Sequence, residues 1–132
     1  MKVLANDGIS VNAVNILNKS GFDVYLDKIE QDNLIDFINL NKISVLLVRS
    51  ATQVRKNIID NCQSIKIIGR GGVGMDNIDV EYAKTKDILV INTPAASSNS
   101  VAELVFAHLF SGSRFLFGSN RNMPLEGEKS FK

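Results

Sequence analysis

The sequence of 132 residues has one cysteine, one histidine, two prolines and no tryptophan, and these shortages exclude several classes of protein. The single cysteine, Cys62, cannot form an internal disulfide, so we expect a reducing compartment, the cytoplasm. The only histidine, His108, lies far from Cys62 in sequence, and a cysteine nucleophile needs a nearby base. We therefore interpret Cys62 as a buried, unreactive thiol and His108 as a packed interface residue.

Charge of one sign is not in excess either. Lysine and arginine total 15 against 14 aspartate and glutamate residues, so we expect no nucleic-acid or membrane-surface partner. No apolar run approaches the ~20 residues that span a bilayer, and residues 1–7 turn polar too soon for a signal peptide. Asp76, Asp79 and Glu81 fit a turn and a helix cap, so no metal site is predicted.

Short apolar runs that alternate with helical patterns are the main positive feature of the sequence. The runs of strand length are residues 3–5, 22–26, 44–48, 65–68 and 88–91. Helical patterns lie between them, at residues 10–20, 32–38, 53–62 and 79–86. Ser10 is placed to cap the first helix and Gly21 to end it. This rhythm is typical of βαβ units and predicts an α/β fold with an open five-stranded parallel sheet, residues 22–26 lying near an edge.

The sequence changes character after the fifth apolar run. Residues 94–99 have the composition of a loop, and Ser100 with Glu103 forms a capping box that predicts a helix running to about Gly118. Apolar side chains point in several directions around this helix, so another domain or subunit should cover it. Residues 119–132 are polar and have no clear period or terminating element, so we expect a chain interrupted part-way.

Three glycines, Gly69, Gly71 and Gly74, match the pattern G-x-G-x-x-G. A dinucleotide fingerprint is disfavoured because the pattern follows the fourth strand and leads to a turn and a cap at Asp79 rather than directly into a helix. The next strand also ends at Asn92, where an acidic residue would be expected. We interpret the loop as one that brings backbone N–H groups close to an anion, with a tight turn that binds nothing as the alternative.

Arg49 follows the apolar run at residues 45–48, at the carboxyl end of the predicted third strand. Open α/β sheets bind ligands at that edge, and a guanidinium suits phosphate or carboxylate, with Ser50 as an auxiliary donor. The alternative is an arginine that pairs with a local carboxylate. Because the third and fourth strands should be close in the sheet, we expect Arg49 and the glycine loop to form one anion pocket.

Four segments together resemble the D-2-hydroxyacid dehydrogenases: residues 48–52, 68–79, 90–94 and 100–104, in the order and spacing of that family. The resemblance implies a flavodoxin-like substrate-binding lobe at residues 1–97. It also implies a crossover helix at residues 98–118 that takes part in a dimer contact. Residues 119–132 would then be a linker or tail into an NAD-binding Rossmann domain absent from this chain.

The resemblance also implies roles for single residues. Arg49 and Ser50 would contact the substrate, with Arg49 facing a phosphate. Backbone N–H groups of Val73 and Gly74 would hold the substrate carboxylate, and Val73 would border the nicotinamide. Ser97 is expected at the cofactor, although the family often has an asparagine at that position.

The likeness is strongest to the family members that oxidise 3-phospho-D-glycerate to 3-phosphohydroxypyruvate with NAD, the first step of serine biosynthesis. Such an enzyme acts on a small phosphorylated 2-hydroxyacid and assembles as a homodimer or higher homo-oligomer. The family's glycine fingerprint and its catalytic arginine, glutamate and histidine lie beyond residue 132, so this chain has no catalytic residue and should be inactive alone. The alternatives are a glyoxylate/hydroxypyruvate reductase and a non-catalytic ligand-binding or corepressor-like module.

Overall fold

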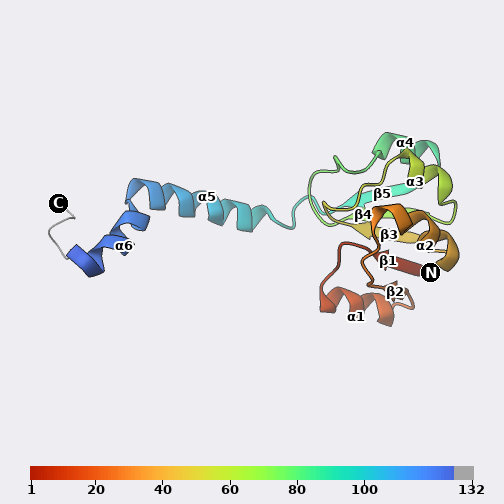
Figure 1. The fold of residues 1–132 in the computed structure, drawn as a ribbon, viewed down its shortest axis with the longest axis horizontal. Coiled ribbons are helices and arrows are strands. Elements are labelled where there is room, and N and C mark those ends of the chain that lie inside the picture. Colours follow the sequence, from red (N-terminus) through yellow and green to blue (C-terminus); the bar gives the residue numbers. More distant parts are fainter. Residues whose placement is uncertain (127–132) are drawn as a thin grey trace. The chain divides into compact units, whose positions relative to one another are not determined.

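A computed structural model describes residues 1–126, and the chain divides into two compact units, Met1–Pro94 and Ala95–Lys132. The first unit is built on a five-stranded sheet in the order β2-β1-β3-β4-β5, and all four strand pairings are parallel (Figure 1). This confirms the predicted α/β fold and the edge position of the second strand. Within the described residues, no helix is long and apolar enough to cross a membrane.

Three of the five strands end level with one another on the side where the site is expected. The strands are β1 Lys2–Ala5, β2 Asp23–Tyr25, β3 Val45–Val48, β4 Ile67–Arg70 and β5 Leu89–Asn92. Val48 lies opposite Arg70, and Arg70 lies opposite Asn92. The carboxyl ends of β3, β4 and β5 therefore present their last residues in a single row.

The predicted fourth strand, residues 65–68, is wrong by two residues. Strand β4 begins at Ile67 because Ile65 still donates its N–H to Cys62 in the turn after the preceding helix. It ends at Arg70 and so includes Gly69, which the sequence pattern had placed in a loop. A Cβ on Gly69 would come within 2.8 Å of the Leu47 side chain, so glycine is what allows this close packing inside the sheet.

Four helices accompany the sheet: α1 Val11–Lys19, α2 Leu34–Asn41 (preceded by the 3-10 turn η1 Gln31–Asn33), α3 Lys56–Asn61 and α4 Val80–Thr85. Figure 1 shows α1 on one face of the sheet and α2, α3 and α4 on the other. The Ser10 side chain accepts a hydrogen bond from the Ala13 N–H, at 3.2 Å, which confirms the predicted cap. The helix predicted from residue 53 begins only at Lys56, because Val54 pairs in parallel with Ile78.

The core lies between the sheet and α2, α3 and α4. Leu4, Leu46 and Ile68 are fully buried in one cluster with aliphatic residues of these helices. Cys62 is part of this cluster, and burial raises the pKa of its thiol to about 11. The interpretation of Cys62 as a buried thiol is confirmed.

The second unit contains α5 Ser98–Ser113 and α6 Leu116–Glu126. The predicted capping box is wrong, because the helix begins two residues before Ser100, with Ser97 in the cap position. The helix also does not run to Gly118: Phe115, at φ 53°, turns the chain between α5 and α6. Most of the predicted polar tail is helical in α6, and its remaining residues, 127–132, lie outside the described residues.

Helix α5 has no buried residue in this structure. More than half of the surface of several of its large apolar side chains is exposed: Val101, Leu104, Val105, Phe106, Leu109 and Phe110. Soluble proteins seldom leave such a surface uncovered. Its covering by another domain or subunit stays a prediction.

Candidate functional site

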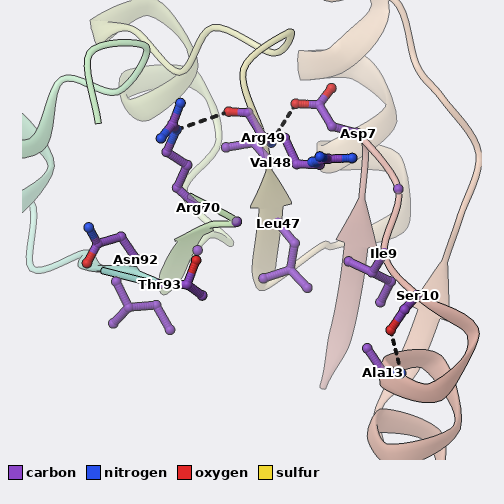
Figure 2. A pocket seen from close by; sticks show the side chains of 14 residues that line it. Asp7, Ile9, Ser10, Ala13, Leu47, Val48, Arg49, Arg70, Asn92 and Thr93 are labelled. Atoms are coloured by element: carbon purple, nitrogen blue, oxygen red, sulfur yellow. Dashed lines mark hydrogen bonds between the residues drawn. The ribbon is translucent and has the colours of Figure 1, made fainter. Parts of the chain in front are cut away.

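A pocket of about 710 Å³ lies in the first unit, at the carboxyl ends of β3, β4 and β5 and beside the loop that joins β1 to α1 (Figure 2). Its apolar wall comes from residues that include Leu47, Ile91 and Ala13. Polar groups of Asp7, Arg49, Arg70, Asn92 and Thr93 also line it. This is the edge at which open parallel sheets bind ligands, because the loops there diverge.

The two loops that the sequence singled out lie side by side at this edge. The Gly71 N–H donates to the carbonyl of Val48 at 2.9 Å, which joins the end of β4 to the end of β3. A Cβ on Gly71 would lie 3.6 Å from Cγ of Arg49, which is ordinary contact distance and places the two residues next to each other. The predicted juxtaposition of Arg49 with the glycine loop is confirmed.

Arg70 is a site residue that sequence reasoning missed. Its Nε donates to the Arg49 carbonyl at 3.4 Å, and its guanidinium lies against Gly72 and Gly74. The Arg70 side chain is only 14% exposed, and its ion pair with Asp76 is long, at 4.0 Å, to a carboxylate that is 89% exposed. A mostly buried charge with such weak compensation favours an additional anion. The predicted strand ends at residue 68, so the sequence pattern does not indicate that Arg70 is the last residue of β4 and lies beside Val48.

Asp7 was also missed. Its carboxylate accepts hydrogen bonds from the backbone N–H groups of Arg49, at 2.6 Å, and Thr52, at 3.1 Å, and from the Thr52 hydroxyl, at 2.7 Å. Partial burial raises the pKa of Asp7, but these hydrogen bonds outweigh it and leave the pKa below its usual value. Asp7 is therefore ionised at neutral pH, in the wall of a pocket that also contains two arginines.

Two buried side chains, Asn6 and Asn77, form hydrogen bonds with the loop after β3. Asn6 donates to the Thr52 hydroxyl at 2.8 Å. Asn77 donates to the carbonyls of Arg49, at 2.9 Å, and Thr52, at 2.7 Å. Residues 49–52 are thus tied to the end of β1 and to the loop after β4, which fixes the backbone that carries Arg49.

The remaining predicted site residues occupy different places. Ser50 lines an adjoining pocket of about 460 Å³ that it shares with Asp7 and Arg49. Val73 is 53% exposed, and its carbonyl accepts a hydrogen bond from Asn92 at 2.6 Å. Val73 and Gly74 line neither of these two pockets, and Ser97 belongs to the second unit. Their contacts with a substrate or cofactor stay predictions.

The glycine loop does not have the form of a dinucleotide cradle. Helix α4 begins only at Val80, so the glycines do not open a helix whose N-terminus could face a pyrophosphate. The space beside Gly71 and Gly72 is filled by the chain's own Arg49 and Arg70. Among residues 1–126, no three histidine, cysteine, aspartate or glutamate side chains come together as metal ligands would.

Comparison with known proteins identifies the family. The profile of the catalytic domain of D-isomer specific 2-hydroxyacid dehydrogenases matches residues 3–120. The chain belongs to this family. The predicted resemblance is thereby confirmed, and the pocket at the strand ends lies within the matched part of the chain.

Relatives of the chain include a hydroxypyruvate reductase of Thermotoga maritima, 42% identical over 87% of this chain and 37% of the relative. A D-3-phosphoglycerate dehydrogenase of Methanocaldococcus jannaschii is 39% identical over 86% of this chain and 21% of the relative. The crystal structure of NAD⁺-bound 3-phosphoglycerate dehydrogenase from Entamoeba histolytica superposes with a TM-score of 0.70 at 34% identity, covering 86% of this chain and 39% of that one. The chain thus spans well under half the length of these relatives.

Proposed function

We propose that this chain is the N-terminal part of an NAD-dependent D-2-hydroxyacid dehydrogenase whose first unit binds 3-phospho-D-glycerate for oxidation to 3-phosphohydroxypyruvate. The relatives support this substrate class, because several of them are D-3-phosphoglycerate dehydrogenases. The oxidation is an activity of the longer protein, and the chain alone is expected to be inactive. Serine biosynthesis, a cytoplasmic location and a homodimer or higher homo-oligomer belong to the same proposal.

One observation carries this proposal: two arginines flank the same backbone at the pocket. Figure 2 shows the Arg49 guanidinium on the β1 side of its own backbone and the Arg70 guanidinium on the β4 side. 3-Phospho-D-glycerate has an anion at each end, a phosphate and a carboxylate, and guanidinium groups bind both well. In this proposal Arg49, with Ser50, faces the phosphate. The backbone N–H groups of Val73 and Gly74 hold the carboxylate beside Arg70.

The chain's own residues bind and orient the acid rather than react with it. NAD supplies the hydride acceptor, and Val73 and Ser97 are proposed to border it. The glycine loop does not fit a whole dinucleotide, so other parts of the protein would hold most of the cofactor. Helix α5 is proposed to lead toward them and to form part of the subunit contact, which agrees with its exposed apolar residues.

The test is a binding titration of the 132-residue chain by calorimetry, with 3-phosphoglycerate and D-glycerate as ligands. Replacing Arg49 removes a charge-assisted hydrogen bond, so Arg49→Ala should weaken 3-phosphoglycerate binding roughly 10- to 100-fold and D-glycerate binding much less. Arg121→Ala, an exposed arginine of α6, is the matched control and should change neither. Equal losses for the two acids would contradict a phosphorylated substrate.

A second candidate is a reductase of glyoxylate or hydroxypyruvate, favoured by the 42% identity to the Thermotoga maritima enzyme. This function needs no phosphate contact. The same titration separates the two candidates, because a hydroxypyruvate reductase would bind D-glycerate at least as tightly as 3-phosphoglycerate in the unmodified chain.

A further inference from the structure

The carboxylate of Asp7 occupies an unexpected place for a negative charge. It lines the pocket that contains Arg49 and Arg70, where simple electrostatics would have it repel a phosphorylated ligand. It also lines the adjoining pocket with Ser50. The charge therefore opposes the proposed function unless it contributes something that outweighs the repulsion.

That contribution is visible in its hydrogen bonds. Both oxygens of Asp7 are used: Oδ2 accepts from the N–H groups of Arg49 and Thr52, and Oδ1 accepts from the Thr52 hydroxyl. No ion pair links the Asp7 carboxylate to the Arg49 guanidinium among the described residues. The carboxylate thus holds the Arg49 backbone and leaves its charged end available to a ligand.

Thr52 connects this contact to the protein interior. Its hydroxyl donates to Asp7 and accepts from Asn6, and both Thr52 and Asn6 are buried. Asn6 is fixed in turn by the backbone of Ile29 through two hydrogen bonds, at 3.0 and 2.8 Å. A continuous series of hydrogen bonds therefore links the loop after β2, through the residues that follow β1, to Arg49.

We propose that Asp7, together with Thr52, is a positioning residue that fixes the loop at residues 49–52 so that Arg49 meets the phosphate, although the negative charge of Asp7 repels that group. This inference rests on the proposed function and deepens it. In this proposal, the preference for the phosphorylated acid depends on Asp7 and Thr52 as well as on Arg49, which contacts the phosphate.

The sign of one mutational effect separates positioning from charge. Asp7→Ala removes both the hydrogen bonds and the repulsion, and we expect about tenfold weaker binding of 3-phosphoglycerate. Asp7→Asn removes the charge but keeps an oxygen for the two N–H groups and an amide that can donate to the Thr52 hydroxyl. It should therefore restore most of the affinity. If electrostatics alone mattered, both variants would bind the phosphorylated acid more tightly.

Thr52 provides a second pair without any change of charge. Thr52→Val has nearly the same shape but no hydroxyl, and it should weaken 3-phosphoglycerate binding in the same direction as Asp7→Ala. Thr52→Ser keeps the hydroxyl and should bind 3-phosphoglycerate nearly as tightly as the unmodified chain. The decisive readout is the ratio of affinities for 3-phosphoglycerate and D-glycerate, since a general loosening of the lobe weakens both acids equally and leaves that ratio unchanged.

Each result has one meaning when the unmodified chain and Arg49→Ala are titrated alongside. A chain that does not prefer 3-phosphoglycerate, or an Arg49→Ala variant that binds it normally, refutes the proposed function and this proposal with it. If Arg49→Ala loses affinity while Asp7→Ala binds as tightly as the unmodified chain, or more tightly, only the positioning role is overturned. Equal weakening of both acids in Asp7→Ala overturns it as well.

Discussion

Gly72 lies directly against the guanidinium of Arg70: a Cβ on Gly72 would come within 2.6 Å of Nη1. The next two closest atoms to that position also belong to the Arg70 side chain. The missing side chain at residue 72 is therefore what lets Arg70 lie beneath the turn after β4. The turn and the arginine form one unit, and a change in the first should displace the second.

Gly72→Ala should consequently affect binding. Gly72 is at φ 157°, so an alanine strains the turn, and its Cβ also displaces the flexible end of the Arg70 side chain. Both changes move Arg70, so 3-phosphoglycerate affinity should fall by about tenfold, the loss of one charged contact. Calorimetry measures this loss. Gly112→Ala in α5, where a Cβ would meet nothing within 4 Å, is the control and should leave binding unchanged. Unchanged binding in Gly72→Ala would mean that Arg70 does not contact the ligand.

The thiol of Cys62 predicts a loss of stability in alkaline solution. Burial raises its pKa from 9.0 to about 11, so the folded chain retains a proton that the unfolded chain releases between these values. The resulting contribution to stability is fully present below about pH 9 and is lost as the pH rises toward 11. Urea unfolding at successive pH values should show the decline. Cys62→Ala should be less stable below about pH 9, where the contribution of the thiol is fully present, and should lack this component of the pH dependence.

Helix α5 predicts self-association. Phe106 and Phe110 stack with their ring centroids 6.1 Å apart, and both are exposed together with Leu109. Burying such a surface stabilises an assembly by roughly 25 cal/mol per Å² of apolar area, so the chain should form dimers or larger species as its concentration rises. Sedimentation velocity measures this, and Phe106→Ser with Phe110→Ser should shift the chain to monomer. Leu40→Ser, an exposed leucine of α2, should not.

The sheet could be predicted from sequence because buried parallel strands are continuous apolar runs and turns interrupt them. That logic succeeds for residues 45–48, and it fails at Gly69–Arg70, where a glycine and an arginine resemble a loop although they complete β4. It fails again at α6, which has no apolar period and carries Pro124. Hydrophobic periodicity reports packing against a core, and these segments are shaped by other contacts.

The candidate site divides in the same way. Arg49 was predictable because a charged residue directly after a buried strand must lie at the sheet's edge. Asp7 and Thr52 were not, because they are 45 residues apart and their significance depends on hydrogen bonds that exist only once β1 and β3 are neighbours. A sequence pattern shows which residues lie at the carboxyl edge of the sheet, but not which of them form hydrogen bonds that position the others.

The level row formed by Val48, Arg70 and Asn92 has a thermodynamic consequence. An acid bound across it would contact groups supplied by separate strands, and no such contact survives in the unfolded chain. Because the ligand binds only the folded sheet, it stabilises the fold by mass action. The free energy of unfolding rises once the ligand concentration exceeds the dissociation constant. The melting temperature of the first unit should therefore rise with the concentration of an acid that binds there.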